Sequence, residues 1–579
     1  MEAGGVRFRV WAKSKTLRLI VEGERIRLPW EEGPDGVREV VVAGLGAGAR
    51  YGYEIDGQGP FPDMASRFQP EGVHGLSEVI SPDFAWSDAG FVLPAWMETV
   101  FYELHVGTFS EEGTWKGAAE KLSYLRELGV NAVELMPVAS FPGRWNWGYD
   151  GVGLYAPSAN YGRPEEFRAF VNRAHGLGLA VYLDVVYNHL GPDGAYHRLF
   201  HSGFYQEGTH TPWGEALRYE GVAREFFIEN ALHWVREYHV DGFRLDATHA
   251  ISDARERHFV AELAERVRAA AQAMGRECRV LAEDDRNEIG LLRGGAERGW
   301  GLDAVWADDF HHQMRRGLAG DQDGYYADYS GTVSDVVKTL DAGWFYQGQR
   351  SEVHGRARGS STNGMPRERF VICIQNHDQV GNRARGERLH HQVRAAEYVA
   401  ASALLLLAPE TPLLFMGQEW AASSPFLYFT DHNQELGRLV SEGRRREFAH
   451  FAEFASEEGR QTIPDPQSEQ TFATSRLHWE EKEEGEHAWV LAWYRKLLAL
   501  RGEVRVGECA VRKEGNGVLL RWSSENGAHY VFVSWLGEAE WKGVPENAAL
   551  LLGSEGARIE NGCCLLAGPG FAIFRVSGG

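Results

Sequence analysis

Residues 242–249 read GFRLDATH, a short apolar run that ends in an acid, Asp246. Two further segments repeat this pattern: RVLAEDD (279–285) with Glu283, and VICIQNHDQ (371–379) with Asp378. A nearly continuous apolar run of this length is typical of a strand buried in a parallel sheet. An acid at its carboxyl end lies where the core meets a loop face, which carries the chemistry in a (β/α)8 barrel. Three such acids predict one converging site.

The pattern along the chain predicts three domains, because 579 residues are too many for a single hydrophobic core. Residues 1–90 read as short alternating strands between glycine-rich turns, which is typical of a β-sandwich. Residues 91–502 alternate strand, loop and helix, and predict the (β/α)8 barrel. Strands return in 503–579, so we expect a second β-sandwich there.

Eight strands and their helices account for the predicted barrel. We place the strands at 99–107, 132–138, 180–187, 242–248, 279–284, 304–310, 369–378 and 411–420. Amphipathic or apolar helices are predicted at 117–129, 164–178, 258–275, 394–408 and 487–501. Two long loops are expected at 189–222 and 313–366, and loops of that length usually carry function or are disordered.

Composition limits the classes of partner. Lys and Arg number 60 and Asp and Glu number 82, which gives a net charge of −22. This balance argues against nucleic acid or an anionic membrane as a partner, and leaves a neutral polar ligand open. The five cysteines are sparse and lack metal-site spacing, which fits a reducing cytoplasm. The start of the sequence lacks a signal-peptide core, and the longest apolar run is too short to span a bilayer.

Paired carboxyl groups are the chemistry of glycosidic bond cleavage, where one must be ionised and the other protonated. Asp246 is the better candidate nucleophile, because Arg244 lies two residues earlier on the same face of the strand. Glu283 reaches one carbon further and suits a proton donor. Asp378 is placed to hold sugar hydroxyls. We expect no metal or cofactor, since this mechanism needs neither.

Other polar residues near the strand ends are weaker candidates for sugar binding. Asp184 and His189 belong to DVVYNH after the third strand, His377 precedes Asp378, and Tyr149 follows the second strand as a stacking platform. A lone acid at a strand end is more often a helix N-cap, and the acidic run that starts at Glu283 has the alternative of a solvated face. If all of these residues had only such structural roles, several independent coincidences would be needed to place them at the strand ends.

Four segments resemble the signature blocks of the α-amylase superfamily, glycoside hydrolase family 13. They are DVVYNHLG (184–191), GFRLDATH (242–249), LAEDDRNE (281–288) and QNHDQVGNR (375–383). The resemblance implies that Asp246 is the nucleophile, Glu283 the acid/base and Asp378 the residue that stabilises the transition state. It also implies sugar-binding roles at the cleavage subsite for Arg244, His189 and His377.

Within that superfamily, further motifs are similar to the maltooligosyltrehalose trehalohydrolases. They include YELHVGTFSEEGTW (102–115), NWGYDGVGLYAP (146–157) and TDHNQELGRLVSEGRRREF (430–448). That likeness implies release of trehalose from a maltooligosaccharide with a terminal trehalose unit, and a maltooligosyltrehalose synthase as functional partner. A trehalose-shaped leaving side should come from the loops, with Trp213, Tyr325 and His249 as candidates. A branching or debranching enzyme, and a non-catalytic sugar-binding barrel, are the alternatives.

Overall fold

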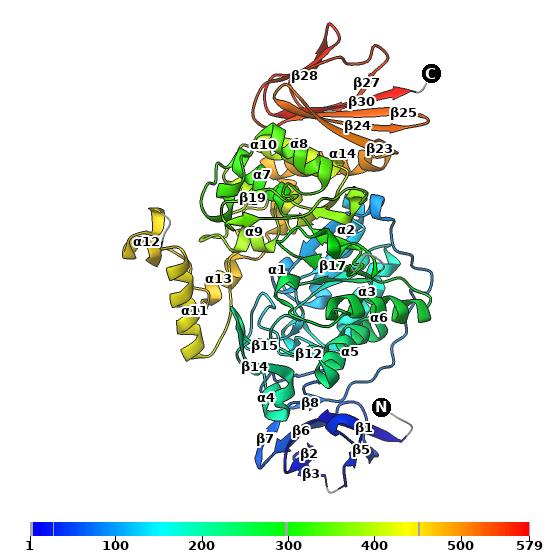
Figure 1. Ribbon diagram of the computed structural model, residues 1–579, viewed down its shortest axis with the longest axis vertical. Coiled ribbons are helices and arrows are strands. Elements are labelled where there is room, and N and C mark those ends of the chain that lie inside the picture. Colours follow the sequence, from blue (N-terminus) through cyan, green and yellow to red (C-terminus); the bar gives the residue numbers. More distant parts are fainter. Residues whose placement is uncertain (1–3, 27, 296–298, 450–451, 578–579) are drawn as a thin grey trace.

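The computed structural model describes residues 4–26, 28–295, 299–449 and 452–577 (Figure 1). Three parts follow one another along its longest axis. β-sheets of the amino-terminal part (blue) lie at one end, a barrel surrounded by helices lies in the middle, and β-sheets of the carboxyl-terminal part (red) cap the other end.

The central part is a closed barrel of eight parallel strands, which confirms the predicted fold class. In ring order from the first strand they are β9 (Phe101–Leu104), β10 (Ala132–Leu135), β13 (Ala180–Val185), β16 (Gly242–Leu245), β17 (Arg279–Glu283), β18 (Ala304–Trp306), β21 (Phe370–Ile372) and β22 (Thr411–Phe415). The ring closes where β22 pairs with β9 through Leu413 and Phe101. Because all strands run the same way, their carboxyl ends meet at one end of the barrel.

Helices surround the barrel and begin and end at recognisable signals. They include α2 (Trp115–Leu128), α3 (Pro164–Gly176), α5 (Gly221–Tyr238), α6 (Phe259–Ala273), α7 (Asp309–Leu318), α8 (Val333–Ala342), α10 (Ala395–Leu407) and α14 (Gly485–Val504). In α2, the Thr114 side chain accepts a hydrogen bond from the Gly117 N–H. The same helix ends at Gly129, whose φ of 107° favours glycine.

Two details of the sequence prediction are wrong. The predicted strands run past the observed ones: the segment 369–378 contains only three strand residues, and its end forms the short helix α9 (His377–Gly381). Apolar residues beyond the last strand pair are buried too, so composition does not reveal where the ladder stops. The predicted loop 313–366 is interrupted by α8, and the loop 189–222 contains the hairpin of β14 (Tyr205–Thr211) and β15 (Gly214–Leu217).

Each end part consists of two sheets around a shared apolar core. The amino-terminal sheets are β1 (Gly5–Trp11), β5 (Val37–Ala43) and β4 (Glu31–Glu32), and β3 (Glu24–Arg25), β2 (Leu17–Val21), β6 (Arg50–Ile55) and β7 (Gln58–Phe61), with β8 (Ser77–Glu78) beside β6. Phe8, Val40, Leu19 and Tyr53 meet between them. The carboxyl-terminal sheets are β23 (Glu508–Glu514), β24 (Gly517–Ser524), β25 (Gly527–Ser534), β30 (Gly570–Ser577) and β27 (Ala549–Gly553), and β26 (Ala539–Lys542), β29 (Cys563–Leu566) and β28 (Ala557–Glu560).

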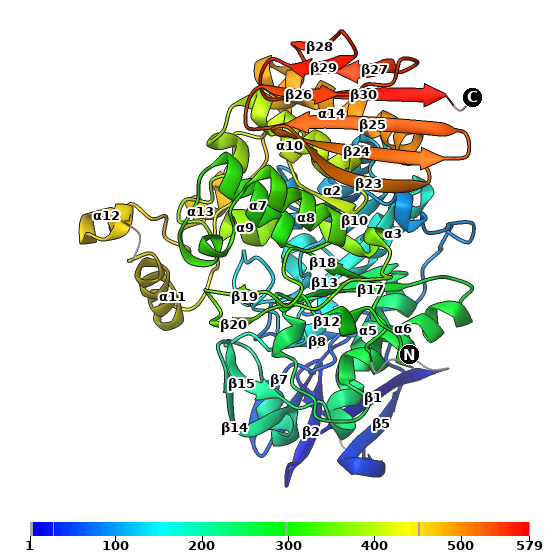
Figure 2. The same cartoon turned by 45° about the horizontal axis from the view of Figure 1, so that its top comes forward.

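A helical arm projects from the side of the barrel (Figures 1 and 2). It contains α11 (Gln434–Glu447) and α12 (Glu457–Gln461). The buried Arg444 of α11 donates hydrogen bonds to the carbonyl oxygens of Gly381 and Arg383, and so ties the arm to the segment that follows α9. In the described part of the chain, no helix is long and apolar enough to cross a membrane.

Candidate active site

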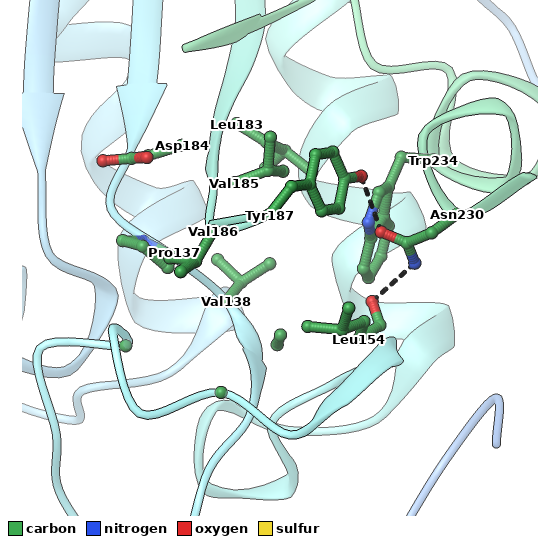
Figure 3. Close-up of a pocket in the computed structure, with 13 residues that line it drawn as sticks. Pro137, Val138, Leu154, Leu183, Asp184, Val185, Val186, Tyr187, Asn230 and Trp234 are labelled. Carbon is green, nitrogen blue, oxygen red and sulfur yellow. Dashed lines mark hydrogen bonds between the residues drawn. The ribbon is translucent and has the colours of Figure 1, made fainter. Parts of the chain in front are cut away.

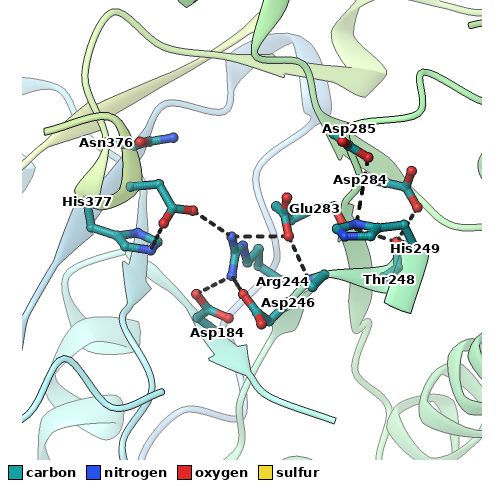
Figure 4. Close-up of polar contacts among 12 residues, drawn as sticks. Asp184, Arg244, Asp246, Thr248, His249, Glu283, Asp284, Asp285, Asn376 and His377 are labelled. Carbon is teal, nitrogen blue, oxygen red and sulfur yellow. Dashed lines mark hydrogen bonds and ion pairs between the residues drawn. The ribbon is translucent and has the colours of Figure 1, made fainter. Parts of the chain in front are cut away.

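The three acids that the sequence singled out lie together around Arg244 at the carboxyl ends of the barrel strands. Figure 4 labels two of them, Asp246 and Glu283. Asp246 follows β16 directly, Glu283 is the last residue of β17, and Asp378 lies in the first turn of α9 after β21. Their side chains remain open to solvent, with relative exposures of 13%, 17% and 37% respectively. Parallel strand ends therefore bring together acids that are up to 132 positions apart, from 246 to 378.

One buried guanidinium, that of Arg244, faces all three acids. Its Nη1 donates to Asp246 Oδ1 at 2.8 Å and to Asp184 Oδ2 at 2.7 Å. Its Nη2 lies 3.8 Å from Glu283 Oε2 and 3.6 Å from Asp378 Oδ2. The side chain is fully buried, with the ring of Trp306 at 4.4 Å. A buried cation with these neighbours holds a cluster of carboxyl groups together that would otherwise repel one another.

Glu283 has the environment of a proton donor. Burial raises the pKa of its carboxyl well above the usual range, Arg244 opposes this rise, and Asp246 and Asp378 add to it. Its Oε2 accepts a hydrogen bond of 2.6 Å from the backbone N–H of Ala247, which fixes the carboxyl beside Asp246. The raised pKa favours the protonated form of the carboxyl that the sequence assigned to proton donation.

Asp378 has the opposite environment. Burial by itself raises the pKa of its carboxyl, but His377 and Arg244 outweigh burial and lower that pKa to about 2. Asn382 Nδ2 also donates to Asp378 Oδ1 at 3.2 Å. Asp378 is thus an anion throughout the neutral range and can accept hydrogen bonds from sugar hydroxyls.

Tyr149, His377 and Asp184 form a hydrogen-bonded chain beside Arg244. The Tyr149 hydroxyl lies 2.5 Å from Asp184 Oδ2 and 2.7 Å from His377 Nε2. The Tyr149 ring stacks on the His377 ring, with centroids 5.1 Å apart. Burial raises the pKa of Asp184 to about 6 against the effect of Arg244. Tyr149 therefore orders the wall of the site through its hydroxyl, besides the stacking role that the sequence suggested.

His189 and Trp213 lie on the neighbouring part of the rim. His189 Nε2–H donates to the Tyr149 carbonyl oxygen at 2.9 Å, and its ring stacks on Trp213 with centroids 5.3 Å apart. Trp213 occupies the turn between β14 and β15 and is 43% exposed. The hairpin thus places an open indole face beside a predicted sugar-binding histidine.

Tyr325 and His249 are more peripheral. Tyr325 is 44% exposed, and its hydroxyl donates to Gln379 Oε1 at 3.1 Å, one residue beyond Asp378. His249 lies on the other side of the Glu283 strand end, 3.8 Å from Asp285 Oδ1 (Figure 4). The structure therefore gathers seven of the eleven predicted site residues in one network, with His189 bonded to it through Tyr149 and Trp213, Tyr325 and His249 around it.

Three acids near this network, two buried and one half-buried, were not assigned a role from the sequence. Glu103 on β9 and Glu134 on β10 project inside the barrel, and Asp308 precedes α7. Burial, followed by Asp378 and Asp309, raises the pKa of Asp308 to about 7. The sequence carried a signal for Glu103 and Glu134, because each is the single acid in an otherwise apolar strand, FYEL and AVEL respectively.

One group in the described part of the chain has metal-ligand chemistry, made of His249, Asp284 and Asp285. Their potential ligand atoms lie within 4.8 Å of one another. Asp284 is already neutralised by Arg286, whose Nε and Nη2 donate at 2.8 and 2.6 Å, and it also accepts from Thr248. This group is accounted for by an ion pair.

A small cavity lies behind the carboxyl end of β13 (Figure 3). Its volume is about 20 Å³, and its wall includes Asn230, which accepts from the Tyr187 hydroxyl and donates to the Leu154 carbonyl oxygen. A space of that size holds one water molecule at most, so it is no sugar site.

Known proteins are similar to this chain in sequence and in architecture. The alpha amylase catalytic domain model matches residues 80–212. A malto-oligosyltrehalose trehalohydrolase of Deinococcus radiodurans is 47% identical over 506 residues, which are 86% of this chain and 81% of the relative. One of Arthrobacter ramosus is 41% identical over 592 residues, covering 98% and 99%. The crystal structure of a putative alpha amylase from Salmonella typhimurium is 36% identical with a TM-score of 0.88, covering 100% and 98%. On sequence, fold and site together, the chain is a glycosidase that belongs to the malto-oligosyltrehalose trehalohydrolase family.

Proposed function

We propose that this glycosidase hydrolyses the α-1,4 bond next to the terminal trehalose unit of maltooligosyltrehalose, and so releases trehalose and a maltooligosaccharide. The observation that carries the proposal is the arrangement of Asp246 and Glu283 on either side of the Arg244 guanidinium, at the open end of the barrel. The names of relatives that match most of the chain support this substrate over other α-glucans.

The proposed reaction has two steps and retains the anomeric configuration. In the first, an Asp246 oxygen bonds to the anomeric carbon while the bond to the leaving oxygen breaks, and Glu283 gives its proton to that oxygen. Trehalose leaves, and a glycosyl ester on Asp246 remains. In the second step Glu283 takes a proton from water, the water oxygen bonds to the anomeric carbon, and the ester bond breaks.

The electrostatics of the site support this division of roles. Asp246 accepts a charge-assisted hydrogen bond from Arg244, which favours the anion needed for attack. The raised pKa of Glu283 favours the protonated carboxyl needed at the same moment. Asp378 is an anion on the same face, and we assign it the hydroxyls of the reacting sugar, where its hydrogen bonds strengthen at the transition state.

On the leaving side we propose that the rim residues contact trehalose. Trp213 offers a flat exposed face, and Tyr325 and His249 offer polar groups beside Asp378 and Glu283. A rim built from loops suits a bent α,α-1,1 disaccharide, because loop side chains can approach it from more than one side.

The functional partner that we propose is a maltooligosyltrehalose synthase, which would form the substrate from a maltooligosaccharide. The proposed compartment is the cytoplasm, and the five free cysteines support it because free thiols persist in reducing surroundings.

A product assay tests the proposal. The enzyme is incubated with maltopentaose and, separately, with maltotriose carrying a terminal trehalose unit, and the products are separated by chromatography. Release of trehalose from the second substrate, with slow attack on the first, is the expected result. In a third incubation, with amylose, new branch points would instead identify a branching enzyme if no trehalose is released from the second substrate. Proton NMR of the fresh product tests retention, since the α-anomer must appear first.

A further inference from the structure

The first two barrel strands each carry one acid inside the barrel, below the catalytic acids. Glu103 of β9 and Glu134 of β10 are direct register partners, and each is 1% exposed. Their environments differ. Neither carboxyl oxygen of Glu134 has a hydrogen-bond partner among the described residues. Both carboxyl oxygens of Glu103 are engaged, and both by the same residue.

That residue is His377, next to the catalytic Asp378. Glu103 Oε2 accepts the His377 backbone N–H at 2.9 Å, and Glu103 Oε1 lies 2.5 Å from the ring Nδ1. A carboxylate that grips both the backbone and the ring of one residue fixes its position and its ring orientation at once. These two hydrogen bonds link Glu103 on β9, the first barrel strand, to His377 after β21, the seventh.

Hydrogen-bond directions show that both nitrogens of the His377 ring carry protons. Nδ1 faces a carboxylate and must donate to it. Nε2 faces the Tyr149 hydroxyl, whose single proton goes to Asp184 Oδ2. Asp184, whose pKa is raised to about 6, is ionised at neutral pH, so its Oδ2 accepts from both Tyr149 and Arg244. The Tyr149 oxygen is then left to accept from Nε2–H, and the ring is an imidazolium.

We infer that Glu103 is a positioning residue for the proposed hydrolysis: its carboxylate holds His377 as an imidazolium that donates to Tyr149 and faces Asp378. His377 Nε2 lies 3.4 Å from Asp378 Oδ1, so the same cation places the acid that we assign to the sugar hydroxyls. Glu103 touches no substrate in this scheme and acts through the histidine. The inference rests on the proposed function and names a residue that supports it.

The charged groups around His377 determine the pH at which its imidazolium loses a proton. The ring interacts with Glu103 from β9, Glu134 from β10, Asp184 from β13, Asp378 from α9, the neighbouring His105 and the Tyr149 hydroxyl. Arg244 from β16 contacts that hydroxyl and Asp184. Burial lowers the pKa of His377, but Asp378 and Glu103 outweigh it and hold that pKa well above the usual range. Loss of the Glu103 charge therefore lets the proton leave at a lower pH.

Glu103→Gln and Glu134→Gln make a matched pair, with the same change at paired, equally buried positions. Burial, with the Glu103 charge, raises the pKa of Glu134 well above its usual range, so Gln resembles the neutral acid already present. For E103Q we expect kcat to fall about 100-fold with KM nearly unchanged, because a displaced catalytic group costs about that much. In E103Q the alkaline limb of the kcat–pH profile should move to lower pH. Glu103→Asp should restore much of kcat and much of the position of that limb. E134Q should stay close to wild type in both.

Each outcome decides. A folded E103Q enzyme with wild-type kcat and alkaline limb, or equal losses in E103Q and E134Q, would overturn the inference. If the E103Q variant does not fold, the double variant that carries both Glu103→Gln and His377→Asn is tested by thermal unfolding. Recovery of folding in the double variant supports the charge partnership between the two residues. Continued failure to fold shows a merely structural role for Glu103 and overturns the inference. The proposed function fails separately, when the wild-type enzyme releases no trehalose.

Discussion

At the scale of single residues, the site places the same functional group in two different environments. Asp246 and Glu283 are both carboxylic acids that project from neighbouring strands. Arg244 donates a hydrogen bond of 2.8 Å to Asp246 but lies 3.8 Å from Glu283, and burial raises the pKa of Glu283. The two roles that we propose, acid and nucleophile, can therefore be set by environment without different residue types.

Replacement of the proton donor tests this assignment. In Glu283→Gln the amide cannot protonate the leaving oxygen, so we expect trehalose release to fall about 1,000-fold, within the range for general acid catalysis. Substrate affinity, measured by calorimetry, should change little. Asp285→Asn is the control, because that exposed acid lies two positions away without facing Arg244. More than a tenth of wild-type turnover in E283Q would contradict the role.

The pH dependence offers a second test, through Asp308. Burial is the largest cause of the raised Glu283 pKa, and the Asp308 charge adds to it. With its own pKa at about 7, Asp308 is neutral below that pH and charged above it. Asp308→Asn should therefore leave the acid limb of kcat/KM in place and move the alkaline limb to lower pH, because Glu283 loses its proton earlier. An alkaline limb that stays or moves upward would refute the coupling.

At the scale of elements, the barrel supplies fixed points and the loops supply contacts. The strand ends place Asp246 and Glu283, whereas the β14–β15 hairpin places Trp213 over His189. A catalytic group needs the rigidity of a strand end, and a sugar platform needs an open face that a hairpin turn can present.

Trp213→Ala tests the hairpin as a sugar platform. Stacking on an indole contributes about 1 kcal/mol beyond burial, so KM for the trehalose-terminated substrate should rise about 5- to 10-fold with a smaller change in kcat. Trp213→Phe keeps an aromatic face and should recover part of the affinity. Steady-state kinetics on both variants provide the measurement, and an unchanged KM in W213A would remove Trp213 from the binding surface.

At the scale of the whole molecule, the carboxyl-terminal sheets are joined to the barrel by buried polar contacts. Trp522 Nε1–H of β24 donates to the Leu407 carbonyl oxygen at the end of α10. Arg505 lies 5.3 Å from the Trp522 ring and donates to the carbonyl oxygens of Met97, Pro409 and Glu410. α10 is buried along most of its length, and it contacts β25 and β30 of the carboxyl-terminal sheet as well as α14.

Trp522→Ala should therefore weaken the whole molecule. Truncation of a buried tryptophan, 2% exposed here, costs about 3–5 kcal/mol in the free energy of unfolding. Denaturant titration followed by circular dichroism measures this loss. Trp213→Ala is the matched control, since the same truncation at a 43% exposed position should be nearly neutral for stability. Equal effects at the two positions would contradict the described packing.

Much of the fold and of the candidate site could be predicted from local sequence patterns. Apolar runs locate all eight barrel strands, and the acids after three of them mark the site, because strand composition and strand ends are properties of neighbouring residues. The helix α8 escaped prediction inside a polar, glycine-rich stretch whose local pattern resembles a loop.

The sequence by itself determined the barrel, its flanking sheets and the identity of the three carboxyl groups. Only the tertiary structure decided that Glu103 holds His377 and that Trp213 covers His189. It also supplied the burial that raises the pKa of Glu283. Contacts between distant positions, and the electric field at a buried group, exist only once the ring of strands has closed, so no local pattern can encode them.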